Sequence, residues 1–587
     1  MAPKKITQNE PRRDACRLDW RRTSRSGVNW AMLLTLCCAT LVSADRPKSA
    51  FIDPGPVAFL HSVPSAQTNS SARIEPWFAA GVTNGDRSPE FFRRLREASV
   101  NGNPTAQGFL GMLLLAGDGT TRDASEGIQL LHGSASKGCV PAMAHLGFVL
   151  LEGRGVPADP TQALSWIRRA AAGGSADAQF NLGYCYERGL GGATNVAQAA
   201  LWYRMAAEQS NAPAMGGLGL SYMEARGLPR DYKLAEQWLL KALDGGNLRA
   251  KLNLGHLYLD KGYGTNGPGA AVRLIREAAE AGDFRAQADL ARLYYHGTGL
   301  PKDVTNYLAW TRKSAAQGFA EAEYNMATAL AAGQFIEQDM VAARQWAEKA
   351  ARQGMPQACY MLGTMFVLGN GGEKDFEKGN EWLRKAAAQN HRDAQFRLAM
   401  AGFLGRGMET NKTEALGWLQ RAADGGWPAA EYVLAVYHLN GEAGLPKDLD
   451  QCLKWMQRAA EHGNRDAQFY VASSFLYGRG LPKDMTKAVR WFRSAAEQGH
   501  AEAQNSIGYA CETGDAGYTN RVEAYMWYRL AMKQGESRSQ VNYRRLSPQL
   551  TGEELVEGGR REQEFKPRSA ELPDPFLAIP ASSETSE

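Results

Sequence analysis

Tryptophan recurs along most of this chain at a fixed interval of 36 residues. Seven tryptophans keep the interval, with Leu274 at the one position that lacks a tryptophan, and three more resume it after one added residue. A fixed period of about 20 to 50 residues indicates stacked repeats, each too small to bury its own apolar face. The members of the series are Trp166, Trp202, Trp238, Trp310, Trp346, Trp382, Trp418, Trp455, Trp491 and Trp527.

Each repeat has the pattern of two helices joined by a turn. Ala178, Leu182 and Tyr186 are spaced by four, which places them on one face of a first helix. Gly183 removes a side chain beside that face, so that a second helix can approach closely. A turn such as 297–303 follows, and its final aspartate is suited to cap the second helix, which carries the tryptophan and ends at a glycine.

The tryptophans are the largest apolar side chains that keep the interval. Burying ~200 Å² of indole at ~25 cal/mol per Å² contributes up to ~5 kcal/mol. A helix pair of this length is marginally stable alone, so it needs large anchors between neighbours. We therefore expect the ten tryptophans to be structural anchors rather than ligand-binding residues.

The full motif set resembles a known repeat family. The repeat that runs from Ala467 through 478–484 and Trp491 to Gly499 resembles the Sel1-like repeat, a relative of the tetratricopeptide repeat. About twelve such repeats fit residues 104–536. The resemblance implies an all-α fold, a right-handed α-solenoid of stacked antiparallel helix pairs whose first helices line a concave face.

The regions beside the repeats predict caps and linkers. Residues 88–103 have the phase of a lone second helix, and 537–565 that of capping helices, with capping-box spacing from Thr551 to Glu554. Terminal caps with polar faces keep a solenoid soluble. Residues 45–87 have the composition of a flexible linker, and 566–587 that of a disordered tail.

The first 44 residues have the order of a secretory signal peptide. A basic stretch is followed by an apolar run from Trp30 to Val42 and a small-x-small site, which predicts cleavage between Ala44 and Asp45. The alternative is an uncleaved membrane anchor over 28–44. We expect the protein outside the cytoplasm, in a bacterial periplasm or secreted, with membrane contact only if this segment is retained.

The charge pattern gives no support for nucleic acid as a partner. Residues 1–26 hold eight basic and three acidic residues, so their net charge of +5 equals that of the whole chain. The remainder is neutral and shows no basic stripe with interleaved aromatic residues. We predict no nucleic-acid partner.

The sequence shows no catalytic, metal or cofactor motif. It contains no HxxxH, HExxH or CxxC, and the G-x-G-x-x-G pattern at 262–267 follows a helix rather than a strand. Five cysteines remain after the predicted cleavage, an odd number in separate repeats, so we expect buried single thiols. These are Cys139, Cys185, Cys359, Cys452 and Cys511.

Candidate binding residues lie beside the packing face of the first helices, where the residue type varies between repeats. Variation of this kind suits a specific ligand path. The candidates are Asp177, Tyr184, Glu187, Arg188, His256, Asp260, Arg292, His296 and Tyr509, with Thr328, Thr364 and Ser473 in equivalent positions.

These features favour a non-enzymatic scaffold or adaptor. Its expected partner is a protein or peptide, or an envelope polymer such as polysaccharide or peptidoglycan, bound on the concave face. Two alternatives come from the resemblance: a eukaryotic secretory-pathway adaptor of the endoplasmic-reticulum type, and a β-lactam-binding or β-lactam-hydrolysing repeat protein. No cofactor is expected.

The signal-peptide hypothesis predicts the mature amino terminus. Because the small-x-small site ends at Ala44, the exported protein should begin at or near Asp45. Mass spectrometry of the exported protein measures this directly. An intact Met1 on that protein would contradict cleavage and favour the anchor.

Overall fold

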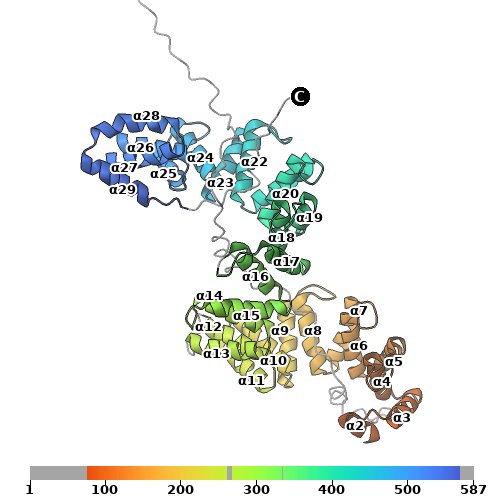
Figure 1. Ribbon diagram of the computed structural model, residues 1–587. Helices are drawn as coiled ribbons and strands as arrows, with labels where there is room; N and C mark the ends of the chain where they lie inside the picture. Colours follow the sequence, from red (N-terminus) through yellow and green to blue (C-terminus); the bar gives the residue numbers. More distant parts are fainter. Residues whose placement is uncertain (1–75, 261–266, 334, 569–587) are drawn as a thin grey trace, which may run out of the picture. The chain divides into compact units, whose positions relative to one another are not determined.

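The part of the chain that the structure describes consists mainly of helices. The computed structural model describes residues 76–260, 267–333 and 335–568. Over these ranges it contains 28 α-helices and one short 3-10 helix and no strand (Figure 1). They divide into two compact units, here called the N-terminal unit (76–317) and the C-terminal unit (318–568). The predicted all-α class is confirmed.

The N-terminal unit holds six helix pairs, and in each pair we call the first member the A helix and the second the B helix. Its A helices are α4 (Pro104–Ala116), α6 (Val140–Glu152), α8 (Ala176–Arg188), α10 (Ala212–Glu224), α12 (Arg249–Leu259) and α14 (Phe284–His296). Its B helices are α5 (Ala124–Ser136), α7 (Pro160–Ala172), α9 (Val196–Glu208), α11 (Tyr232–Asp244), α13 (Gly267–Glu280) and α15 (Val304–Ala316).

The C-terminal unit continues the same alternation with six more pairs. Its A helices are α16 (Ala320–Ala332), α18 (Pro356–Leu368), α20 (Arg392–Leu404), α22 (Pro428–Asn440), α24 (Arg465–Tyr477) and α26 (Ala501–Thr513). Its B helices are α17 (Met340–Arg352), α19 (Phe376–Ala388), α21 (Lys412–Asp424), α23 (Leu449–Glu461), α25 (Met485–Glu497) and α27 (Arg521–Lys533). Within a unit, each B helix packs against its own A helix and the next one, which confirms the stacked helix pairs.

The predicted aspartate caps of the B helices are confirmed. The carboxylates of Asp159, Asp231 and Asp303 each accept a hydrogen bond from the backbone N–H three residues later. Asp448 and Asp484 do the same. Each satisfies a backbone donor that has no partner within its helix, which is why the turn sequence fixes where the B helix begins.

The A and B helices of a pair approach most closely at a glycine or alanine of the A helix. A Cβ on Gly183 would lie 2.7 Å from the Tyr203 ring, and one on Gly219 would lie 2.7 Å from Leu239 Cγ. The large side chain that fills this space belongs to the residue directly after the tryptophan position. The large residues at this position are fully or almost fully buried. They include Ile167, Tyr203, Leu239, Ile275, Leu383, Leu419, Met456 and Tyr528.

The tryptophans themselves lie nearer the surface than this deep residue. Trp166, Trp455 and Trp527 are buried, and the other seven are half-buried. In seven repeats a lysine or arginine three residues later lies over the indole, 3.7–4.6 Å from the ring centroid. A cation over an indole adds about 0.5–1 kcal/mol at an exposed site. The tryptophans therefore contribute packing at the edge of the core, and the next residue fills its centre.

In four repeats, paired side-chain amides join the A and B helices. Gln179 on α8 donates to the Ala171 carbonyl at the end of α7 (3.2 Å) and accepts from Gln209 at the end of α9 (2.7 Å). The same pairing recurs 30 residues apart in Gln287–Gln317, Gln468–Gln498 and Gln504–Gln534. These amides satisfy buried backbone carbonyls at the helix ends.

The amino-terminal end differs from the predicted linker. Residues 76–83, inside the linker expected over 45–87, form helix α2 (Pro76–Thr83), so the linker prediction is wrong for this part. Phe78 and Val82 are buried, and Phe78 packs edge-on against Phe109 at 5.3 Å. This apolar pair at i and i+4 outweighs the polar composition around it. The capping helix α3 (Pro89–Val100) follows, with Ser88 as its N-cap.

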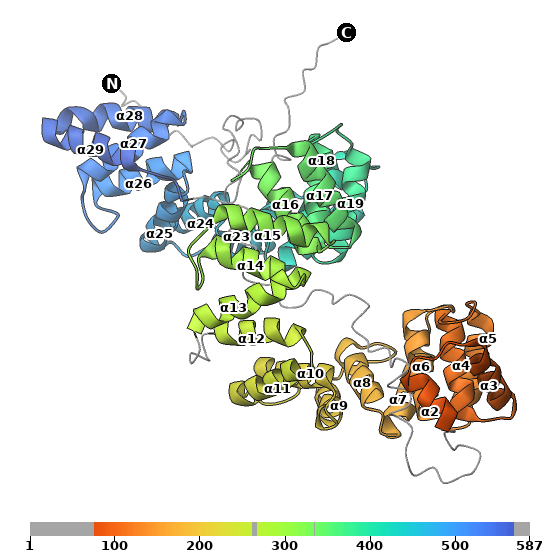
Figure 2. The same ribbon diagram turned by 60° about the horizontal axis from the view of Figure 1, so that its bottom comes forward.

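The carboxyl-terminal end has the two predicted helices. Helix α28 (Ser537–Leu546) is followed by η3 (Ser547–Gln549) and α29 (Gly552–Glu564), whose capping box at Thr551 and Glu554 is present. Both α-helices pack on α27, and the two views show them beside it (Figures 1 and 2). At residue 568, inside the predicted tail, the Arg568 backbone donates to the Glu497 carbonyl (2.8 Å), whereas 569–587 lie outside the described residues.

The close approach of helices predicts a compensating pair of substitutions. Gly219→Ala should lower the free energy of unfolding by about 1–3 kcal/mol through overpacking, and Leu239→Ala by about 2–5 kcal/mol through the cavity it leaves. The double variant should lose at least about 1 kcal/mol less than the sum, because the new methyl group enters the space that Leu239 vacates.

Urea unfolding of the three variants measures this coupling. Gly417→Ala is the control, because nothing lies within 4 Å of a Cβ at this helical glycine. It should be neutral or stabilising by about 0.5–1 kcal/mol. Strictly additive losses at Gly219 and Leu239 would contradict the packing argument.

Candidate binding surface

The candidate residues lie on A helices, and the N-terminal unit carries most of them. On α8, Asp177 and Glu187 each have a polar partner beside one end of α10, the next A helix. Asn211 Nδ2 donates to Asp177 Oδ1 at 2.8 Å, and Arg226 pairs with Glu187 at 3.0 Å. Tyr203 also donates its hydroxyl to Glu187 at 2.7 Å. These carboxylates therefore link neighbouring repeats, and they also lie at the edge of the A-helix face.

Two candidates on α8 have different environments. Tyr184 is only 4% exposed, so its ring is part of the packed interior rather than an accessible contact. Arg188 is half-buried, with its guanidinium carbon 5.8 Å from the Tyr184 ring centroid. The sequence pattern placed both beside the packing face, but the neighbouring helices cover the tyrosine.

Two other candidates, His256 and Arg292, are brought together by a carboxylate between them. Asp289 Oδ2 lies 2.8 Å from His256 Nε2, and Asp289 Oδ1 lies 2.6 Å from Arg292. Burial would raise the pKa of Asp289, but the interactions with His256, Arg292 and Arg285 outweigh it and lower the pKa. The carboxylate, with its side chain 16% exposed, is thus held ionised between side chains from α12 and α14.

The remaining candidates lie at the ends of A helices or in the C-terminal unit. His296 is the last residue of α14, and its pKa is lowered by burial and by the charges of Arg292 and Lys302. Asp260 is exposed at the C-cap of α12. Tyr509 on α26 is 47% exposed in the C-terminal unit. The predicted cleavage site, Ala44 and Asp45, and most of the 262–267 glycine pattern lie outside the described residues.

Sequence reasoning missed the acidic residues at the centre of the charged clusters. Asp289 lies three residues before Arg292, a spacing that places two side chains on the same helix face and could have indicated the pair. Glu431 on α22 is fully buried, 3.0 Å from Arg458 and 2.8 Å from His462, both of its own repeat. It replaces the glutamine of the amide pairs, a substitution visible only once the pairing is known.

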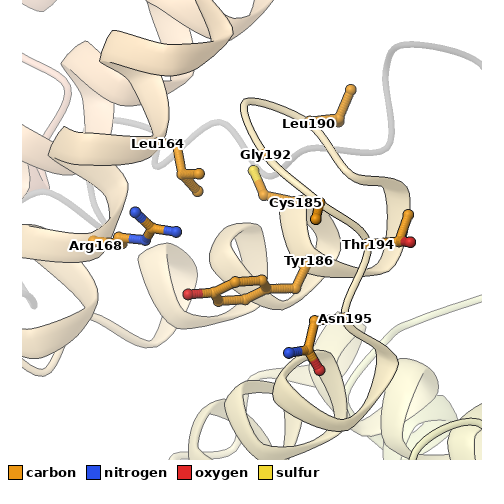
Figure 3. A pocket seen from close by; sticks show the side chains of 9 residues that line it. Leu164, Arg168, Cys185, Tyr186, Leu190, Gly192, Thr194 and Asn195 are labelled. Carbon is orange, nitrogen blue, oxygen red and sulfur yellow. The ribbon is translucent and has the colours of Figure 1, made fainter.

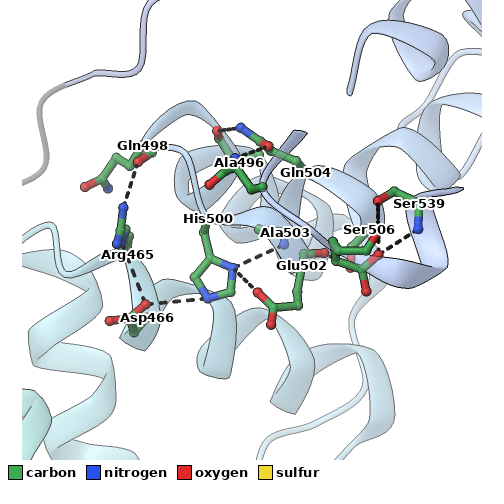
Figure 4. Close-up of polar contacts among 12 residues, drawn as sticks. Arg465, Asp466, Ala496, Gln498, His500, Glu502, Ala503, Gln504, Ser506 and Ser539 are labelled. Atoms are coloured by element: carbon green, nitrogen blue, oxygen red, sulfur yellow. Dashed lines mark hydrogen bonds and ion pairs between the residues drawn. The ribbon is translucent and has the colours of Figure 1, made fainter. Parts of the chain in front are cut away.

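Two histidines cap A helices of the C-terminal unit through Nδ1. His391 Nδ1 accepts from the Ala394 backbone at 3.4 Å, and His500 Nδ1 from Ala503 at 3.3 Å. Each ring stacks on an aromatic ring of the preceding A helix, at 4.5 and 4.4 Å. Around His500, Asp466 and Glu502 approach Nε2 and Nδ1 at 3.6 and 3.3 Å (Figure 4). An Nδ1 that accepts a hydrogen bond requires a neutral ring.

The five cysteines are buried single thiols, as the sequence predicted. Burial raises the pKa of Cys185 to about 12 and that of Cys452 to about 11, so both are thiols rather than reactive thiolates at neutral pH. Over the described ranges, no group of three or more His, Cys, Asp or Glu side chains is placed to hold a metal ion. Nor is any helix there long and apolar enough to span a membrane.

Comparison with known proteins decides the family. The family model described as "Sel1 repeat" matches twelve consecutive segments, from 104–139 to 501–536. The chain belongs to the Sel1 repeat family. Proteins built from these repeats are in general protein-interaction scaffolds. The twelve matched segments coincide with the twelve helix pairs, which confirms the recognised repeat number.

Solved structures of Sel1 repeat proteins resemble this one. One is c5321, a protective antigen present in uropathogenic Escherichia coli strains, at 28% identity over 81% of this chain and 94% of that chain, with a TM-score of 0.49. Another is a Sel1 repeat protein from Oxalobacter formigenes, at 31% identity over 53% and 90%, with a TM-score of 0.43. A comparison with curated proteins finds no match.

Protonation of His391 should destabilise the C-terminal unit. Burial, with the charges of Arg392 and Arg397, lowers the pKa of His391 to about 4, below its ordinary value of about 6.5. As the pH falls, the unfolded chain therefore binds the proton before the folded chain does. The free energy of unfolding is retained above about pH 6.5 and falls by about 3 kcal/mol toward pH 4. Urea unfolding at pH 7 and pH 4.5 measures the loss.

His391→Asn is the matched variant, because asparagine caps the same position at Asn211 and Asn464. It should reduce the difference between the two pH values, since only the histidine contribution is removed. An unchanged difference would show that His391 does not carry this part of the acid sensitivity.

Proposed function

We propose that this Sel1 repeat protein is a non-enzymatic scaffold that binds a protein or peptide on its A-helix face, outside the cytoplasm. The recurring positions are used for helix packing and helix capping, and in four repeats for amide pairing, which leaves these side chains little freedom to select a ligand. The positions that differ between repeats carry ionisable and aromatic side chains on the A helices. This division of roles supports a scaffold whose specificity lies in the irregular positions.

The observation that carries this proposal is the cluster of His256, Asp289 and Arg292. It combines side chains from two consecutive A helices, and its outer members stay accessible, with His256 36% and Arg292 55% exposed. Asp289 contacts one side of the His256 ring and one side of the Arg292 guanidinium, and the guanidinium has further N–H donors available. A peptide that presents carbonyl or carboxylate oxygens satisfies these donors through charge-assisted hydrogen bonds.

The proposed location rests on the amino-terminal pattern of basic, apolar and small residues before Asp45. A protein that works outside the cytoplasm meets exported proteins, peptides and envelope polymers. Of these, the exposed Arg292 guanidinium favours a peptide, whose carbonyl and carboxylate oxygens can accept its remaining N–H donors.

Affinity capture with matched variants tests the proposal. The chain from Asp45 onward would be immobilised as the unmodified form, as His256→Ala, as Arg292→Ala and as the control Arg312→Ala. Arg312 is an exposed arginine on the B helix α15 of the same unit. Loss of one charge-assisted hydrogen bond should weaken capture of the partner by about tenfold or more.

We expect the two A-helix variants to lose a partner that the Arg312 variant keeps, with unchanged melting curves. Equal loss in all variants, or none, would contradict a site at this cluster. Release of the captured partner by glycan-degrading enzymes rather than by protease would replace the peptide with an envelope polymer.

A further inference from the structure

A cavity of about 240 Å³ opens between α7, the end of α8 and the loop that leads to α9. Leu164 and Leu190 form apolar walls, and Arg168, Tyr186 and Asn195 provide the polar edge (Figure 3). The Cys185 side chain also lines it. The volume is below the roughly 300–1,000 Å³ of sites for drug-sized ligands, so it suits a single side chain or a small acid.

Arg168 stands two residues after the tryptophan of its B helix. The same position holds an arginine in other repeats, where the structure shows its partner. Arg493 on α25 pairs with the Glu523 carboxylate at 2.7 Å, and Arg529 on α27 pairs with that of Glu562 at 2.7 Å. Both carboxylate side chains are well covered, at 14% and 1% exposure. The arginine at this position therefore binds a carboxylate from the next segment of chain in two of its occurrences.

Two further repeats fill the position differently. Arg204 donates to the Tyr222 hydroxyl at 3.1 Å, and Arg276 to that of Tyr294 at 3.4 Å. At Arg168 the corresponding ring is Tyr186, and the guanidinium carbon lies 5.6 Å from its centroid. Arg168 is an exposed residue that lines the cavity, and among the described residues no carboxylate or hydroxyl forms a hydrogen bond or ion pair with it.

We propose that this cavity binds a carboxylate carried on a short aliphatic stem. The carboxylate pairs with Arg168, as Glu523 does with Arg493, and the stem contacts Leu164 and Leu190. Burial raises the pKa of Cys185 to about 12, so the sulfur near the cavity carries no negative charge that would repel the ligand. The site lies between the B helix α7, the end of the A helix α8 and the loop after it, and it shares no residue with the cluster of His256, Asp289 and Arg292.

Titration of the full chain with pentanoate tests the site. The methyl signals of Leu164 and Leu190 would be followed by nuclear magnetic resonance, with pentanamide as the neutral analogue of equal shape. Pentanoate should cause saturable shifts of these signals and pentanamide should not. Arg168→Gln should weaken binding by about tenfold to a hundredfold, as expected for a lost charge-assisted hydrogen bond.

Two more variants separate the contribution of Arg168 from that of the cavity. Arg204→Gln removes the equivalent arginine one repeat later and should leave pentanoate binding unchanged. Ala193→Leu fills the cavity while keeping Arg168, and it should abolish binding. Absence of saturable shifts, equal binding of pentanamide, or unchanged binding in Arg168→Gln would each overturn the proposal.

The same titration identifies the source of the carboxylate. Three probes are compared: free pentanoate, a blocked pentapeptide with one central glutamate, and an acetylated pentapeptide that ends in a free leucine carboxylate. Tightest binding by the first indicates a small-molecule acid, by the second an acidic side chain, and by the third a chain terminus. Failure of all three contradicts a carboxylate site.

Discussion

The rest of the structure depends on the close approach of the A and B helices within each pair. Where the backbones come nearest, the A helix carries glycine or alanine, and one large side chain of the B helix fills the gap. Ile167 against Gly147 and Ile275 against Gly255 show the arrangement at its tightest, because a Cβ on either glycine would lie 2.5 or 2.6 Å from the isoleucine. Because each pair buries this contact with its own residues, it can be repeated without change along the chain.

That constraint explains which parts of the fold were predictable. Helix pairs, aspartate caps and the final helices follow from local sequence and nearest-neighbour contacts, both of which keep the 36-residue interval. The depth of the residue after the tryptophan was missed, because its identity ranges from alanine to tyrosine while its position is constant. Helix α2 was missed because its apolar segment is only eight residues long and stands inside a longer stretch with the composition of a linker.

The candidate site was less predictable for a different reason. The varying positions on the A helices were found from the sequence, but their accessibility depends on neighbours from other repeats. Tyr184 is covered, whereas Tyr509 at the same position of another repeat is exposed. Two carboxylates organise the charged clusters, and no periodic signal marks them. Asp289 has a partner in the preceding A helix, and Glu431 has partners in the following B helix and at its end.

An alanine scan of α12 and α14 that reads melting temperature and partner capture together tests the central claim, that packing and recognition use different positions. The account predicts two separate sets of sensitive residues. Substitutions at the buried Leu254 and Leu290 should lower the melting temperature and reduce capture only as far as the chain unfolds. Changes among the varying A-helix positions should reduce capture alone. The account would be contradicted if variants at the regular packing positions stayed fully folded but lost the partner, while variants at the varying positions still captured it.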